Sequence, residues 1–231
     1  MMSETNSDTQ DNSILTTVMG LLYLDENKRK CILAGALIAM AGMFSMSAAG
    51  YGSLVQGLCF SIGLFGVFCA ESILFTGRML SVRYVMNEEI QLRTMLSEWV
   101  GVWVYNLVGA ILMSALAKGC GFDSSTIASA KASIPMLELF IRAILCNIMV
   151  CMAVESGRWQ AKPSERLCAC ILPVACFVTC GFEHSVADMF YMTLGVFSGG
   201  VGLVDTVRVL VVATAGNIVG GTMYAIFGYT R

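Results

Sequence analysis

The sequence CGFEHSVADMF at residues 180–190 interrupts a long apolar stretch and contains the only histidine of the chain, His184. An ionisable side chain at membrane depth is costly and is rarely kept for packing alone. Irregular backbone at that depth is tolerated where it lines a cavity. The position of His184 therefore predicts a transport path, and the alternative is an interfacial histidine in an ordinary loop.

Composition indicates an integral membrane protein. The 231 residues are 57% hydrophobic and 13% charged, with a mean hydropathy of +0.74, which leaves too little polar surface for a soluble globule. Residues 1–27 are polar and acidic and lack the order of a cleaved signal peptide, so we expect a cytoplasmic N-terminal tail. The net charge of −2 and the lack of a basic cluster argue against nucleic acid as a partner.

The ten cysteines do not predict a metal centre, a cofactor or an enzyme. Most of them fall inside apolar runs, where cysteine acts as a small hydrophobic residue. No CxxC pair occurs, and one histidine cannot complete the usual Cys/His ligand sets. A membrane-embedded redox enzyme would need paired thiols or a second histidine for haem.

Eight apolar runs predict six membrane crossings. They cover residues 31–49, 54–70, 74–86, 99–117, 132–154, 167–182, 189–204 and 206–229. Because a bilayer needs about 20 residues per helix, the shorter runs are interpreted as halves of two interrupted crossings, 54–86 and 167–204. Polar or turn-forming residues lie at both interruptions, at 71–78 and 181–188.

The basic residues set the predicted orientation. Ten lie on one side of the six-crossing arrangement and three on the other, and the positive-inside rule then places both termini in the cytoplasm of a cell (plasma) membrane protein. The fourteenth, Arg142, lies inside the fourth crossing, four residues after Glu138. This spacing predicts a neutralising ion pair.

An internal repeat supports this topology. The sequence NLVG at 106–109 returns as NIVG at 217–220, and the two interruptions keep nearly the same offset. Three crossings separate the halves, so the second copy, roughly 131–229, is inverted relative to the first, roughly 28–118. Inverted repeats with one broken helix each build the midplane sites of many transporters.

Ordered motifs in this chain resemble those of the formate/nitrite transporter family: LFTG at 74–77, Lys131, CNIMVCMAV at 146–154, GFEHS at 181–185 and GNIVGG at 216–221. The resemblance covers the membrane portion and implies an all-α, aquaporin-like protomer of six transmembrane helices in an inverted 3+3 repeat. Helices 2 and 5 would be broken at mid-membrane. It also implies a homopentamer with one pore per protomer for small monovalent anions. Ile73, Arg78 and Asp188 depart from the usual pattern.

The resemblance assigns roles to individual residues. Thr76 matches a loop threonine that hydrogen-bonds the central His184 or the anion, and Lys131 matches a lysine that attracts anions into the outer vestibule. Asn147 and Asn217 match polar positions that line or brace the pore. The apolar constriction is assigned to Phe60, Leu64, Leu74, Phe75 and Phe177. Without the resemblance, Lys131 could be a snorkelling helix-end lysine and Thr76 could cap the next helix. Phe60, Leu64 and Phe177 would then be core or lipid-facing packing rather than a gate, and Asn106 is expected to bridge helices.

These assignments predict a pH-dependent, proton-coupled channel or transporter for formate or nitrite, because a bare anion in an apolar constriction costs several kcal/mol. Histidine exchanges protons near neutral pH, so the anion is expected to accept a proton at His184 and to cross as the neutral acid. A hydrosulfide channel of the same fold is one alternative. An aquaporin-like neutral-solute channel is another, although none of the three prolines lies in an Asn-Pro-Ala turn. A purely structural or receptor-like protein would not explain two interruptions.

Overall fold

The computed structural model describes residues 24–158, 160 and 162–228. Within these residues every regular element is a helix and no strand occurs. The predicted tail at 1–27 lies almost wholly outside the described residues. Four helices are long and apolar enough to cross a membrane: α2 (Glu26–Ser47), α6 (Leu92–Gly119), α8 (Met136–Arg158) and α11 (Leu203–Phe227).

Two shorter chains of helix run between the long ones. The first is α3 (Ser53–Cys69), α4 (Phe75–Arg78), the 3₁₀ turn η2 (Met79–Ser81) and α5 (Val82–Met86). The second is α9 (Pro163–Thr179) followed by α10 (Ser185–Phe197). The helix therefore stops at residues 70–74 and again at 180–184, within the two regions where polar and turn-forming residues predict interruptions.

Both interruptions begin with the same C-cap. After α3, Glu71 donates its backbone N–H to Phe68 and Ser72 donates to Val67; after α9, Gly181 donates to Val178 and Phe182 to Phe177. This pattern is a Schellman motif, which needs a left-handed residue just past the helix. Gly181 has a φ of 65° there, and the non-glycine residue Glu71 has a φ of 48°.

The remaining elements are short. The 3₁₀ turn η1 (Ala49–Tyr51) joins α2 to α3, and α7 (Ser125–Ser133) precedes α8. Lys131, which directly precedes the apolar run at 132–154, does not open the fourth long helix but lies near the end of α7. Pro135 has no N–H and disfavours helix in Ile134, which is extended with ψ 131°, so α8 starts afresh at Met136.

Two other predicted boundaries also move. The helix predicted from residue 99 begins at Leu92, because α6 extends by seven residues into a mixed stretch that contains Arg93, Thr94, Ser97 and Glu98. The turn predicted at 181–188 ends earlier, since α10 starts at Ser185 with His184 as its N-cap.

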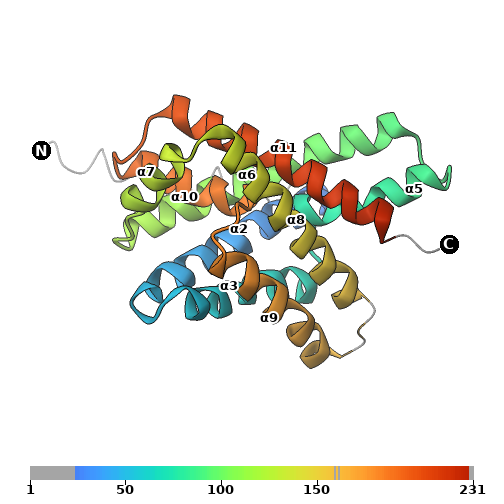
Figure 1. The fold of residues 1–231 in the computed structure, drawn as a ribbon, viewed down its shortest axis with the longest axis horizontal. Helices are drawn as coiled ribbons and strands as arrows, with labels where there is room; N and C mark the ends of the chain where they lie inside the picture. Colours follow the sequence, from blue (N-terminus) through green and yellow to red (C-terminus); the bar gives the residue numbers. More distant parts are fainter. Residues whose placement is uncertain (1–23, 159, 161, 229–231) are drawn as a thin grey trace, which may run out of the picture.

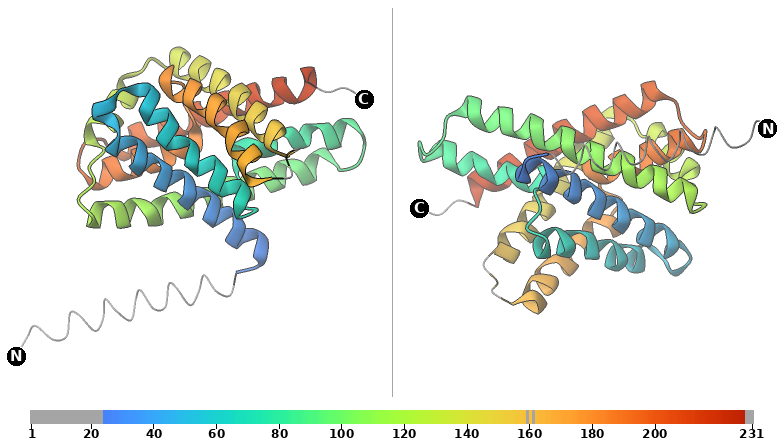
Figure 2. Two further views of the ribbon diagram at one scale, coloured as in Figure 1. Left: turned by 90° about the horizontal axis from the view of Figure 1, so that it is seen from below. Right: turned by 180° about the vertical axis from the view of Figure 1, so that it is seen from behind.

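The two interrupted segments meet in the middle of the molecule. Helix α3 packs against α9, α2 against α3 and α6, α8 against α9 and α11, and α10 against α6. In Figure 1, α3 and α9 lie together below, while α6, α10 and α11 lie above. The two further views in Figure 2 show the long helices running past one another around this centre. Close approach is fixed by small residues, since a Cβ on Gly109 would collide with the Ile32 carbonyl and one on Gly220 with that of Ile144.

Candidate functional site: a histidine between two chambers

His184 occupies the N-cap of α10 and is 3% exposed. Its Nδ1 accepts the backbone N–H of Ala187 at 3.1 Å, and its Nε2 lies 3.0 Å from the Thr76 hydroxyl on α4. The ring stacks on Phe177 with centroids 5.9 Å apart. A nitrogen that accepts a hydrogen bond carries no proton, so the geometry assigns the proton of the neutral imidazole to Nε2, facing Thr76.

Thr76 is placed by α4 rather than acting as its cap. The N-cap of α4 is Leu74, and Thr76 lies inside the helix, fully buried. The alternative that Thr76 caps the following helix is therefore wrong. Its hydroxyl is directed at the histidine, and this contact joins the first interrupted segment to the second.

Two asparagines hold the interrupted backbones. Asn106 on α6 donates to the carbonyls of Cys31 and Ile73 at 2.7 and 3.0 Å, and its oxygen accepts the Phe75 N–H at 2.9 Å. The helix-bridging role expected for Asn106 is confirmed. Its side chain satisfies a carbonyl and an N–H that the broken helix cannot pair.

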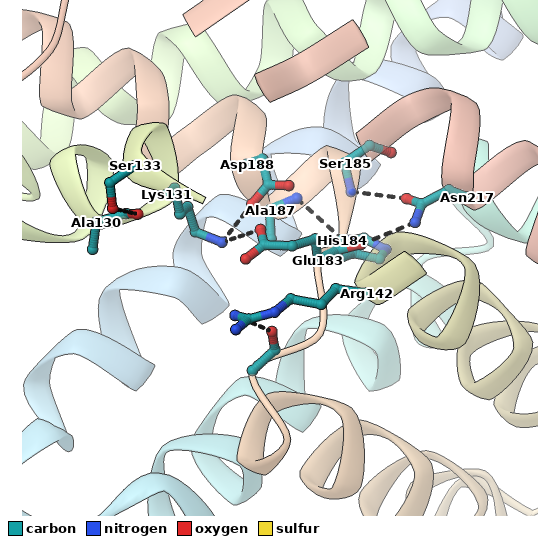
Figure 3. A network of polar contacts seen from close by, with 11 residues as sticks. Ala130, Lys131, Ser133, Arg142, Glu183, His184, Ser185, Ala187, Asp188 and Asn217 are labelled. Atoms are coloured by element: carbon teal, nitrogen blue, oxygen red, sulfur yellow. Dashed lines mark hydrogen bonds and ion pairs between the residues drawn. The ribbon is translucent and has the colours of Figure 1, made fainter. Parts of the chain in front are cut away.

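Asn217 on α11 makes the same three bonds around the second interruption. It donates to Ala143 and Glu183 at 2.8 and 2.9 Å and accepts from Ser185 at 2.8 Å. Figure 3 shows Asn217 reaching the start of α10 beside His184. The partners of Asn217 lie 110 to 112 residues after those of Asn106.

We call the hydrogen bonds that Asn106 and Asn217 each make to the backbone at an interruption a backbone frame. Asn147, on α8, connects the two frames. Its amide donates to the carbonyls of Asn217 and Thr76 at 2.6 and 3.2 Å. Neither Asn147 nor Asn217 lines the cavities described next. In this structure both asparagines make bracing contacts around the breaks.

Three cavities adjoin in the described part of the chain, because the central one shares lining residues with each of the other two. A central cavity of about 10 Å³ is bounded by His184 and apolar side chains. A second cavity of about 220 Å³, the Lys131 chamber, contains Lys131, Glu183, Asp188 and His184. A third, of about 350 Å³, the Arg78 chamber, is lined on α4 by Gly77 and Arg78.

Four of the five predicted constriction residues separate these cavities. Phe60 and Phe177 line both the central cavity and the Lys131 chamber, with ring centroids 6.0 Å apart. Leu64 and Leu74 line both the central cavity and the Arg78 chamber. Phe75 is buried but lines none of the three, and its N–H is held by Asn106.

Lys131 is paired with two carboxylates in its chamber. Its Nζ lies 2.5 Å from Glu183 and 2.8 Å from Asp188, and 5.6 Å from the centre of the Tyr191 ring. Glu183 is 3% exposed and Asp188 is fully buried. Figure 3 shows the lysine directed between the two acids. With all three groups ionised this cluster has a net charge of −1.

Sequence reasoning missed Glu183 as a partner of Lys131, since 52 residues separate them and no local pattern links them. It did single out Asp188 as a departure from the family's usual pattern. The predicted ion pair of Arg142 with Glu138 is confirmed, and Arg142 also reaches the Gly181 carbonyl at 3.4 Å. Within the described part of the chain no cluster of three His, Cys, Asp or Glu could hold a metal ion.

Comparison with known proteins agrees with this architecture. An all-helical fold with apolar spanning helices and a buried polar site between two chambers defines a multi-pass membrane transport protein. The sequence model of the family "Formate/nitrite transporter" matches residues 25–230, and the chain belongs to that family. It is 33% identical to a probable formate transporter of Methanothermobacter thermautotrophicus, with 86% of each chain covered.

Two solved structures have the same fold. An "FNT family ion channel" superposes with a TM-score of 0.82 at 27% identity, covering 88% of each chain. A "pentameric formate channel with formate bound" superposes with a TM-score of 0.78 at 25% identity, covering 88% of this chain and 95% of that one. The relatives are named as transporters and channels, not as enzymes.

Proposed function

We propose that this chain is a pH-dependent, proton-coupled channel for small monovalent anions such as formate or nitrite, with His184 as the group that neutralises the anion. The observation that carries the proposal is the hydrogen bond between His184 Nε2 and Thr76 beside a small cavity with otherwise apolar walls, which shares lining residues with two larger chambers. Formate is named first because the relatives reported above are formate transporters or channels.

The proposed protomer has six crossings in an inverted repeat, with residues 28–118 and 131–229 as its halves. Two observations support the repeat: α3 and α9 end in the same Schellman motif, and Asn106 and Asn217 make the same pattern of hydrogen bonds to the backbone. In this arrangement α3 with α4–α5 and α9 with α10 each form one crossing, broken at mid-membrane. We further propose a pentamer in the plasma membrane with both termini in the cytoplasm, following the relative's printed assembly and the positive-inside rule.

The central cavity sets the chemistry. Its volume of about 10 Å³ is no larger than the space of one water-sized probe, and its other walls are apolar. A bare anion there would lose its hydration at a cost of several kcal/mol, whereas the neutral acid loses far less. Proton transfer before the constriction therefore lowers the barrier to passage.

His184 is oriented to give up a proton rather than to store one. Because Nδ1 accepts the Ala187 N–H, a second proton on the ring would break the cap of α10. The Nε2 proton faces Thr76, whose hydroxyl can accept it while passing its own proton to the anion. A neutral ring cannot lose its only N–H proton to a weak base, so Nδ1 takes a proton from water in the same step and releases the Ala187 N–H while it holds that proton. Return of a proton to Nε2 and loss of the Nδ1 proton to water restore the cap and complete the cycle.

The role proposed for Lys131 depends on its two acids. Attraction of anions requires that the Lys131 chamber not be net negative, so we propose that Glu183 and Asp188 share one proton when the channel conducts. Two carboxylates bound to one ammonium in a buried site cannot easily both stay ionised. The other titratable groups near this cluster are His184, Tyr191 and Cys146. In their neutral forms these groups do not offset its negative charge.

The test is flux into proteoliposomes. His184→Asn keeps an N-cap acceptor and should assemble normally, but it should lose pH-dependent, proton-coupled formate uptake. Thr76→Ser, which keeps the hydroxyl, should retain coupling. Parallel assays with nitrite, hydrosulfide, lactate and glycerol separate the anion channel from a hydrosulfide channel and from a neutral-solute channel. Proton coupling that persists in His184→Asn would rule the mechanism out.

A further inference from the structure

The Arg78 chamber has an excess of positively charged residues, which the Lys131 chamber lacks. Its walls include the side chains of Arg78, Arg158 and Arg166, with Glu71 as the only carboxylate among its lining residues. Its volume of about 350 Å³ exceeds that of the Lys131 chamber. Leu64 and Leu74 line both this chamber and the central cavity beside His184.

The arginines there are only partly neutralised. Arg78 pairs with Glu98 through one guanidinium nitrogen, but its Nε is buried without a hydrogen-bond partner in the described residues. Arg166 uses its Nε on the Gln160 carbonyl at 2.9 Å. None of the ion pairs between described residues involves Arg158, which lines the same chamber as Arg78.

A buried N–H donor without an acceptor and facing like charges are both unfavourable, and a bound anion would relieve both. Guanidinium groups present paired N–H donors in a planar fork, which matches a planar oxyanion with two oxygens. A single-centre anion can accept both N–H groups of one fork only with bent bonds that converge on one atom, whereas two oxygens accept two parallel bonds. The site therefore favours carboxylates and nitrite over hydrosulfide.

We propose that the Arg78 chamber is a binding site for small planar oxyanions, carboxylate or nitrite, and that it holds the anion on the side opposite Lys131 before proton transfer at His184. This inference rests on the proposed function and narrows its substrate class. The binding site also makes the channel asymmetric. The anion concentration that half-saturates transport is lower on the Arg78 side, where ten of the predicted loop cations lie.

Arg158→Gln is the most informative variant, since it removes one chamber charge without breaking an ion pair between described residues. Arg158→Lys keeps the charge but not the fork, and Arg93→Gln, an exposed arginine on α6, is the matched control. The full-length protein in lipid nanodiscs would be titrated with ¹³C-formate, and binding followed by NMR saturation transfer. Flux would be measured in inside-out and right-side-out vesicles with formate and with hydrosulfide.

We expect Arg158→Gln to weaken formate binding about tenfold or more, with Arg158→Lys intermediate and Arg93→Gln unchanged. The half-saturating formate concentration should rise from the Arg78 side only, and that of hydrosulfide should change far less. Equal values for Arg158→Gln and Arg93→Gln overturn the site, and equal losses for formate and hydrosulfide overturn its oxyanion preference. Absence of flux in the unmodified protein with formate binding intact would sink the proposed function and leave the binding site standing.

Discussion

Asp188→Asn is the substitution that most directly tests how charge is balanced at the Lys131 chamber. Asparagine has nearly the shape of aspartate, so the packing of the fully buried side chain on α10 should persist. Asp188 Oδ1 lies 2.8 Å from Lys131 Nζ. Its neutralisation changes the net charge of the ionised cluster from −1 to zero.

The size of the effect follows from Coulomb's law. An anion held in the chamber near Lys131 would lie roughly 6 Å from the Asp188 carboxylate, and at an effective dielectric constant of about 20 two unit charges at that distance repel by ~3 kcal/mol. That energy corresponds to about 100-fold in anion occupancy, and salt and chamber water reduce it to about 10- to 100-fold. Formate uptake above neutral pH should rise by this factor in the variant.

The pH profile gives the sharper readout. As pH rises, the shared carboxylate proton is lost, the chamber becomes net negative and anion access falls. The unmodified channel therefore needs two protons, one on the acid pair and one carried with the substrate, whereas Asp188→Asn needs only the second. In a plot of the logarithm of uptake against pH, the Asp188→Asn line should therefore fall less steeply than that of the unmodified channel, by about one log unit per pH unit.

Asp205→Asn is the control, because it removes a half-exposed carboxylate near the start of α11 that pairs with Arg208 and not with Lys131. Uptake would be followed in proteoliposomes at fixed total formate between about pH 5 and 8. Parallel pH profiles for the unmodified protein and Asp188→Asn would refute the shared proton. A rise of similar size in Asp205→Asn would refute a local effect.

Further predictions concern the backbone frames. Glu71→Gly should raise the free energy of unfolding by up to about 1 kcal/mol, since glycine adopts the left-handed C-cap without strain, and an unchanged melting temperature in detergent would contradict this. Asn106→Ala and Asn217→Ala should each cost about 2–4 kcal/mol by leaving buried backbone groups unpaired, and widely different losses on chemical unfolding would argue against equivalent frames. Gly220→Ala should destabilise the protein because its Cβ meets a carbonyl of α8, whereas Gly101→Ala, with open space around it, should be neutral or stabilising in the same melt.

The interruptions could be predicted from sequence because their cause is local. Two short polar stretches inside otherwise apolar runs leave too few residues for unbroken crossings, and Gly181 marks a turn. The asparagine repeat was also visible, since it needs only a comparison of the chain with itself. The helix start at Leu92 was not, because Arg93, Thr94, Ser97 and Glu98 interrupt the apolar pattern at 92–98 and the apolar run begins only after them.

Side-chain partners across the fold could not be predicted. Lys131 meets Glu183 and Asp188 only because α7 packs against the start of α10, and no local spacing encodes that contact. The grouping of Arg78 with Arg158 depends in the same way on α4 lying against α8. Phe75 illustrates the limit of a motif, since its neighbour Leu74 lines two cavities and Phe75 lines none of the three.

The backbone frames and the chamber charges are separate layers of this molecule. Asn106 and Asn217 bond only to backbone groups, so they fix the positions of Thr76 and His184 whatever charges lie outside. Charges in the two chambers are set by other side chains, among them Asp188 and Arg78, and Asn217 holds Glu183 by its backbone carbonyl rather than by its carboxylate. Substitution at Asp188 or Arg78 can therefore alter which side attracts the anion without disturbing the proton donor. If the layers were coupled, Asp188→Asn would weaken the His184 cap on α10 as well as change the pH profile, and a loss of thermal stability beyond that of Asp205→Asn would reveal it.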